Sequence, residues 1–151
     1  MKLIISPVEY AKITIDNKET KQIWKGLLVY IGISQQDCKL SEKELTQKIE
    51  KISNKLQNLQ IFHKDWKISA SLKDINWEIL LVSNFTLYGR NKKWNKIDFL
   101  DSWNFTDSKR IYDLLVDKLR QDNVQLQTWE FGAYMEIENK NNWPLNYILE
   151  W

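Results

Sequence analysis

The sequence predicts an α+β domain whose sheet is covered on one side by two main helices. Two uninterrupted apolar runs, 26–33 and 79–82, are typical of strands that are buried on both faces. Two amphipathic stretches, 41–59 and 107–121, carry apolar residues at helical spacing. The 151 residues contain no internal repeat and no low-complexity linker, so we expect a single domain, 1–151.

The N-terminal residues are expected to form strands at 3–5 and 8–15, with Pro7 between them. A proline inside a strand favours an edge or a bulge, because its nitrogen has no hydrogen to donate. Residues 16–18 are a turn signal, and the buried strand at 26–33 follows.

The first helix is expected to begin at Ser41, since Ser41 and Glu44 form the S-x-x-E pattern of a capping box. Each side chain of such a pair satisfies a backbone N–H group at the start of the helix. Core packing explains the apolar stripe of this helix, which consists of Leu45, Ile49, Ile52, Leu56 and Leu59.

Shorter segments surround the central strand at 79–82. We expect a short strand at 59–62, a turn at 64–67, a connector at 71–75, the second helix at 107–121, and strands at 124–128, 134–138 and 147–151.

The composition sets broad limits on function. A formal net charge of +2 and one cysteine, Cys38, are compatible with a nucleic-acid partner and with a reducing compartment. No apolar run approaches membrane-spanning length, and the apolar N-terminal stretch is too short for a signal peptide. We therefore expect a soluble, cytoplasmic protein.

Ser83, Asn84 and Thr86 lie where the central strand ends. Short polar side chains at such a place are held rigidly and face a ligand, or they bond to nearby backbone groups. From this stretch alone, local bonding is the commoner arrangement.

A basic loop follows the central strand. Residues 90–96 contain four cations and no acid, namely Arg90, Lys92, Lys93 and Lys96. Such a loop is either a solvated turn or a contact to nucleic-acid phosphates, which attract lysine and arginine in any sequence.

Several kinds of catalytic chemistry are not supported. The only histidine is His63, and nothing in the sequence places it beside a nucleophile as a serine triad requires. One cysteine and one histidine do not make a typical zinc site, and no glycine-rich phosphate loop occurs. We expect no metal and no cofactor.

Six segments, taken in order, resemble the motifs of the D-aminoacyl-tRNA deacylase family over essentially the whole chain. They are 26–33 (G-L-L-V-x-x-G-[VI]), 59–62 (L-R-I-F), 71–75 (S-L-x-D-[VI]), 82–87 (V-S-Q-F-T-L), 131–135 (F-G-A-x-M) and 141–146 (N-x-G-P-x-T).

The resemblance implies a homodimeric, barrel-like α+β fold that hydrolyses the ester between a D-amino acid and the 3′ end of tRNA. It implies that the 2′-hydroxyl group of the tRNA supplies much of the catalytic push. The Trp143–Pro144 bond would be cis and would enter the partner subunit's pocket. The implied catalytic residues are Ser83, Asn84, Phe85 and Thr86, and the implied substrate-binding residues are Pro7, Phe131, Met135, Trp143, Pro144, Leu145 and Asn146.

The chain departs from the family pattern at four of these positions. Asn84 replaces a glutamine, Pro7 an arginine, Trp143 a glycine and Asn146 a threonine. These changes leave a second interpretation open, in which the chain is a catalytically inactive relative that acts as a dimeric RNA- or protein-binding module.

The chain has 8 tryptophans and only 4 glycines. Six of the tryptophans stand where family members commonly carry glycine: Trp24, Trp66, Trp77, Trp94, Trp129 and Trp143. We interpret most of them as UGA codons of a genetic code in which UGA means glycine. A diverged relative that truly carries tryptophan is the alternative.

Overall fold

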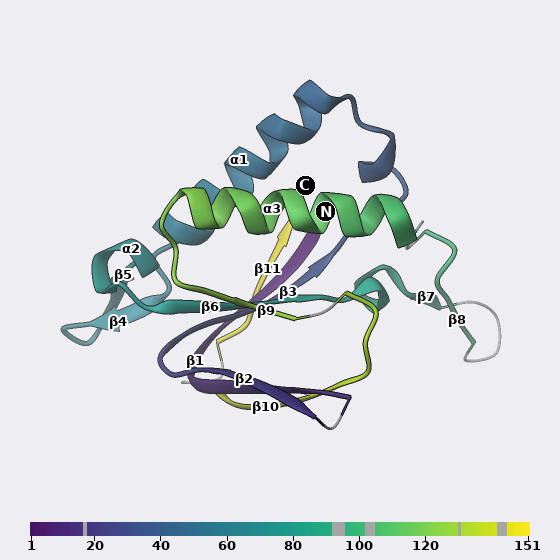
Figure 1. Cartoon of the computed structure of the whole chain (residues 1–151). Helices are drawn as coiled ribbons and strands as arrows, with labels where there is room; N and C mark the ends of the chain where they lie inside the picture. The colour runs from purple at the N-terminus through teal and green to yellow at the C-terminus, as the bar shows by residue number, and fades with distance from the viewer. Residues whose placement is uncertain (17, 92–95, 102–104, 130, 142–144) are drawn as a thin grey trace.

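The strands of the sheet are joined in the order β10-β1-β3-β6-β9, and β2 and β11 also pair with β1 (Figure 1). The computed structural model describes residues 1–16, 18–91, 96–101, 105–129, 131–141 and 145–151. The sheet strands are β1 (Lys2–Ile15), β2 (Glu19–Ile23), β3 (Gly26–Gly32), β6 (Glu78–Ser83), β9 (Leu126–Thr128), β10 (Met135–Asn141) and β11 (Tyr147–Glu150). Two small hairpins pair β4 (Phe62–Lys64) with β5 (Lys67–Ala70) and β7 (Arg90–Asn91) with β8 (Ile97–Asp98).

The sheet is mixed, because β1 is antiparallel to its four neighbours whereas β3, β6 and β9 run parallel. The β2 strand pairs with the second half of β1 and also lies against β6 and β9. The sheet therefore curls back on itself and nearly closes into a barrel, as the family resemblance implied.

Helices α1 (Glu42–Asn58) and α3 (Phe105–Gln121) cover one side of the sheet, as predicted (Figure 1). The capping box at the start of α1 is confirmed: Glu44 N donates to Ser41 Oγ, and Ser41 N donates to Glu44 Oε2 at 2.9 Å. No helix in the described ranges has the length and apolar character needed to cross a membrane.

The strand β1 runs through Pro7 without interruption, so the predicted break into two strands is wrong. Its first part pairs with β11 up to Ile5 and its second part pairs with β10 from Val8. Pro7 lies between these two parts, where a missing N–H group disrupts neither ladder. The predicted bulge is present as a register shift between Val8 and Tyr10.

Other local predictions need correction. Residues 72–75 form the short helix α2 (Leu72–Ile75), which Ser71 and Asp74 cap as Ser41 and Glu44 cap α1. Four strands, β2, β5, β7 and β8, had no signal in the sequence, because most of their residues are polar or exposed. The basic segment 90–96, expected to be a loop, begins with β7. The strand expected at 59–62 is β4, which begins at Phe62. The short 3₁₀ helices η1 (Asp37–Lys39) and η2 (Phe85–Tyr88) follow β3 and β6.

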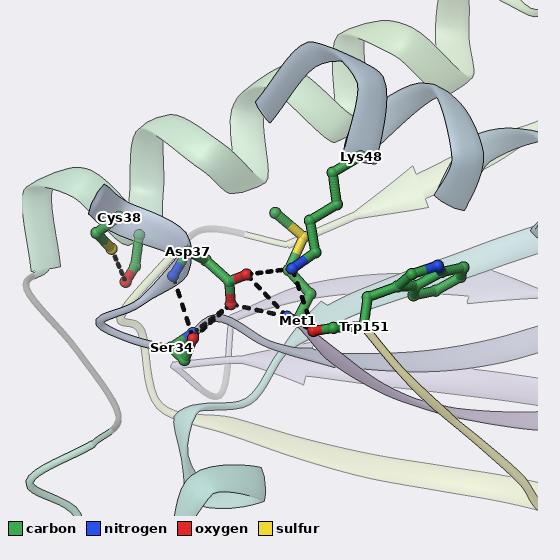
Figure 2. Close-up of polar contacts among 7 residues, drawn as sticks. Met1, Ser34, Asp37, Cys38, Lys48 and Trp151 are labelled. Carbon is green, nitrogen blue, oxygen red and sulfur yellow. Dashed lines mark hydrogen bonds and ion pairs between the residues drawn. The ribbon is translucent and has the colours of Figure 1, made fainter. Parts of the chain in front are cut away.

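Met1 and Trp151 meet at a buried polar network centred on Asp37 (Figure 2). The Asp37 carboxylate accepts from the Met1 amine at 2.9 Å, from Lys48 Nζ at 2.6 Å and from Ser34 Oγ at 2.7 Å. Burial alone would raise the pKa of Asp37, but these donors outweigh burial and hold its pKa below the ordinary value. Burial lowers the pKa of the Met1 amine to about 6. Lys48 and the Met1 amine are the two cationic partners of Asp37.

Candidate functional site

A pocket of about 400 Å³ lies where β6 ends. Its walls come from β3 with Tyr30 and Ile31, from the start of α3 with Phe105 and Ser108, and from Trp129, residues 131–133, Met135 and Ile137. Most of these side chains are apolar, so the pocket suits a ligand with an apolar part and few polar groups.

Two of the motifs found in the sequence meet at this pocket. Ser83, Asn84 and Phe85, at the end of β6, line one side, while Phe131 and Met135 line another. Parallel pairing of β3 with β6 and antiparallel pairing of β1 with β10 bring these distant segments together. Thr86 does not line the pocket; it supports Asn84.

The Asn84 side chain is fixed by Thr86. Its Oδ1 atom accepts from Thr86 N at 3.0 Å and from Thr86 Oγ1 at 2.5 Å, while its backbone N–H donates to Ile31 O at 2.7 Å. Because Thr86 N and Thr86 Oγ1 both donate, the amide oxygen of Asn84 faces Thr86 and its Nδ2 atom points away from Thr86. The Thr86 hydroxyl thus bonds locally, and its acceptor is the Asn84 side chain.

An aromatic cluster backs the pocket. The ring of Phe131 lies edge-on to Phe105, with ring centroids 5.2 Å apart, and stacks on Trp129 with centroids 6.4 Å apart. Tyr112 packs against Phe131 and donates its hydroxyl to Leu81 O at 2.8 Å. Burial raises the pKa of Tyr112, so this hydroxyl stays neutral and anchors α3 to β6.

The other predicted substrate-binding residues lie elsewhere. Pro7, Leu145 and Asn146 are near one another at the bulge of β1 and, within the described part of the chain, do not line the pocket. Asn146 Oδ1 accepts from Ser6 Oγ at 2.5 Å and from Asn141 Nδ2 at 3.0 Å. Trp143, Pro144 and the predicted cis bond between them lie outside the described residues.

The predicted phosphate loop is described only in part. Arg90 forms an ion pair with Asp101 at 2.8 Å, and both side chains are about half exposed. Lys96 is exposed, while Lys92 and Lys93 are outside the described ranges. The Asp101 carboxylate therefore neutralises Arg90, which is one of the four cations predicted to contact phosphate.

Sequence reasoning missed Trp129, Tyr30 and Ser108 as pocket residues. The sequence singled out Trp129 only because family members commonly carry glycine at that position. Nothing in the sequence indicates that Tyr30 on β3 and Ser108 on α3 face the pocket. His63 is exposed on β4 and does not contribute to the pocket. Across the part of the chain that could be searched, no group of histidine, cysteine or acidic side chains could hold a metal ion.

Comparisons with known proteins show the family of this chain. The family model described as D-Tyr-tRNA(Tyr) deacylase matches residues 4–150. The D-aminoacyl-tRNA deacylase of Fusobacterium nucleatum subsp. nucleatum is 36% identical over 99% of this chain and 95% of its own length. The D-aminoacyl-tRNA deacylase of Finegoldia magna is 38% identical over 99% of this chain and 97% of its own.

Two solved structures share the fold. One is described as a c-Myc DNA Unwinding Element Binding Protein, with a TM-score of 0.84, 30% identity, and coverage of 99% of this chain and 98% of that chain. The other, described as a probable eukaryotic D-amino acid tRNA deacylase, has a TM-score of 0.80 at 14% identity and covers 98% and 97%. Because the family model and the relatives match nearly the whole chain, the protein belongs to the D-Tyr-tRNA(Tyr) deacylase family.

Proposed function

We propose that the chain is a D-aminoacyl-tRNA deacylase, which hydrolyses the ester joining a D-amino acid to the 3′-terminal adenosine of tRNA. The observation that carries this proposal is the convergence of Ser83, Asn84 and Phe85 with Phe131 and Met135 on one pocket. Two family motifs that are distant in the sequence thus form one site, in a chain whose relatives are named D-aminoacyl-tRNA deacylases.

In this reaction, water adds to the carbonyl carbon of the ester and the bond to the ribose 3′ oxygen breaks. That oxygen takes a proton, so the products are the D-amino acid and a tRNA with a free 3′-hydroxyl group. Negative charge develops on the carbonyl oxygen in the transition state, and a fixed donor beside it lowers the barrier. The Asn84 Nδ2 group suits this role, because Thr86 holds the other end of the amide.

The mechanism needs no nucleophilic side chain. Of the described residues that line the pocket, none is a histidine or a cysteine. Catalysis would therefore depend on positioning the ester next to the 2′-hydroxyl group of the tRNA, and accurate positioning alone gives large rate factors.

We also propose that the chain, as a single domain 1–151, works as a homodimer in the cytoplasm. Leu145 and Asn146 do not line their own subunit's pocket, which suits a role in the pocket of a partner subunit. The adjoining strand β11 exposes 60% of Ile148 and 37% of Tyr147, and β1 is its one partner in the sheet that the structure describes. An exposed apolar edge of this kind suits an interface with a second copy.

The basic loop would contact the tRNA. Arg90, Lys92, Lys93 and Lys96 are proposed to bind phosphates near the mouth of the pocket, because β7 and β8 follow directly after η2 at the pocket. Replacing Lys92 and Lys93 with alanine should weaken tRNA binding and reduce its dependence on salt concentration.

A second candidate function is nucleic-acid binding without hydrolysis. The similarity to a structure described as a c-Myc DNA Unwinding Element Binding Protein favours it, and so do the departures at Pro7, Asn84, Trp143 and Asn146. In this alternative, the chain binds tRNA or another RNA and leaves the ester intact.

Single-turnover hydrolysis of D-Tyr-tRNA by two asparagine variants tests the proposal. Asn84→Ala should slow hydrolysis by about 100-fold, as expected for the loss of one fixed donor. Asn58→Ala is the matched control, because Asn58 is exposed at the end of α1 and bonds only to Asn54 among the described residues. An Asn84→Ala rate equal to that of Asn58→Ala would contradict the assigned role. Tight tRNA binding with no hydrolysis by the unchanged chain would favour the second candidate.

A further inference from the structure

Three apolar side chains form a surface that leads out of the pocket, and we call Phe85, Ile97 and Phe99 the apolar ledge. Phe85 lines the pocket, and its ring meets that of Phe99 edge-on with centroids 5.3 Å apart. A Cβ atom at Gly89 would lie 2.9 Å from the Phe99 ring and 3.1 Å from Ile97 Cγ2, so both side chains pack over the bare backbone of this glycine. The ledge is therefore one surface that continues from the pocket onto the hairpin of β7 and β8.

The apolar ledge is exposed to solvent. Ile97 is 61% exposed and Phe85 is 45% exposed. Phe105, which also lines the pocket, is 43% exposed. A single exposed apolar side chain needs no explanation, but several that adjoin one pocket indicate a binding surface.

The segment that carries the ledge is anchored where it leaves β8. Gln35 N donates to Asp101 O at 3.2 Å, and Gln35 Nε2 donates to Leu100 O at 2.5 Å. The Asp101 carboxylate also pairs with Arg90 on β7 at 2.8 Å. Because the ledge is held in this way, a partner that packs against it loses little conformational entropy in ordering it.

The charges beside the ledge favour a nucleic acid as the partner. Residues 90–96 contain four cations and no acid, and the exposed Lys96 immediately precedes Ile97. Aromatic side chains next to cations are typical of surfaces that bind single-stranded nucleic acid, because bases pack on the apolar groups while the cations contact phosphates.

We propose that the apolar ledge binds the unpaired nucleotides that precede the 3′-terminal adenosine of tRNA. The pocket holds the terminal adenosine, so the RNA leaves the pocket past the residues at its mouth. Phe85 belongs to both surfaces, and the base next to the adenosine packs against Ile97 and Phe99. This inference deepens the proposed function and rests on it, because it places the aminoacyl-adenosine in the pocket.

The test uses two RNA hairpins that end in the same 3′-terminal adenosine. In one hairpin two cytidines precede the adenosine; in the other both positions are abasic, so the phosphates remain and the bases are removed. Fluorescence anisotropy gives the Kd of each hairpin for the unchanged chain, Ile97→Ala, Ile97→Tyr and the control Ile68→Ala. Ile68 is 40% exposed on β5 and does not line the pocket, so the control makes the same substitution away from the ledge.

The unchanged chain should bind the intact hairpin about tenfold more tightly than the abasic hairpin, as expected for the packing of one base. Ile97→Ala should remove most of this preference, and Ile68→Ala should leave it unchanged. Ile97→Tyr should keep the preference, because an aromatic ring also packs on a base. Equal Kd values of the two hairpins for the unchanged chain, or an equal effect of Ile97→Ala on both Kd values, would overturn the proposal.

A second copy of the chain is the other occupant that the test distinguishes. Light scattering of the unchanged chain and of Ile97→Ala measures self-association. If Ile97→Ala weakens self-association and leaves the preference for the intact hairpin unchanged, the ledge is an interface between copies, and the proposal is overturned.

The two proposals fail in different ways. A preference for the intact hairpin that Ile97→Ala removes, together with no hydrolysis of D-aminoacyl-tRNA by the unchanged chain, would reject the enzymatic function and keep the role of the ledge. Hydrolysis together with equal binding of the two hairpins would keep the enzyme and reject the role of the ledge.

Discussion

Lys48 Nζ lies 2.6 Å from Asp37 Oδ1 and joins α1 to the segment that follows β3. The Asp37 side chain is 2% exposed and that of Lys48 is 18% exposed. Because the pair is largely desolvated, removing one partner leaves a charge that solvent cannot stabilise. We therefore expect this pair to matter for folding more than any exposed ion pair.

Replacing Asp37 with asparagine should lower the free energy of unfolding by about 3 kcal/mol, because the partly buried Lys48 ammonium group then loses its carboxylate partner. Urea unfolding at pH 7 measures the change. Asp113→Asn is the matched control: Asp113 pairs with Lys109 at 2.6 Å, but both side chains are about half exposed. That control should cost less than about 0.5 kcal/mol. Equal losses of unfolding free energy in the two variants would show that burial does not make the Asp37 network more stabilising than an exposed ion pair.

The same residue predicts a dependence of stability on pH. The folded-state pKa of Asp37 is held below the ordinary value of 3.8, so its ionised form contributes stability above that pH. This contribution is lost as the pH falls through the folded-state pKa. The stability difference between the unchanged chain and Asp37→Asn should therefore shrink as the pH falls below about 4. A difference that stays constant down to pH 2 would contradict this assignment.

The turn between β4 and β5 makes a separate prediction. Asp65 and Trp66 have consecutive positive φ angles of 51° and 66°, as in the hairpin turns that favour Asp-Gly. Trp66→Gly should therefore stabilise the protein by about 1 kcal/mol, because a side chain in this conformation is strained. Trp24→Gly, at a residue that is also exposed but lacks a positive φ, should give no gain. Thermal unfolding measures the change in stability of both variants. An equal change in Trp66→Gly and Trp24→Gly would contradict the strain argument.

Two structural features favour the codon interpretation of the tryptophans. Trp66 stands in a turn that suits glycine, and Trp129 buries an N–H group that has no acceptor in the described part of the molecule. We therefore expect UGA at most of the tryptophan codons in the coding DNA, including codons 66, 129 and 143. UGG at all eight positions would reject this interpretation and leave tryptophan as the genuine residue.

Much of the fold follows from local signals in the sequence. The Ser41–Glu44 pattern predicted the start of α1, and the apolar runs predicted β3 and β6, because periodicity and capping are local properties. The continuity of β1 through Pro7 depends on which strands lie beside it, so the sequence alone did not predict it.

The site was predictable only where a family motif marked it. Asn84 and Phe131 were expected at the site from their motifs, and both line the pocket. Trp129 and Tyr30 reach the same pocket through the pairing and curvature of the sheet, which no local pattern encodes. Local bonding of Thr86 was expected from the sequence, but its acceptor, the Asn84 side chain in place of a backbone group, emerged only from the geometry of η2.

The most direct test of the account compares hydrolysis of D-Tyr-tRNA and L-Tyr-tRNA by the unchanged chain under single-turnover conditions. If the pocket at the end of β6 is a D-aminoacyl-tRNA deacylase site, the D-ester should be cleaved at least about 100-fold faster than the L-ester, a difference of roughly 2.7 kcal/mol in transition-state stabilisation. Equal rates for both esters, or no cleavage of either above the rate without protein, would contradict the proposed function.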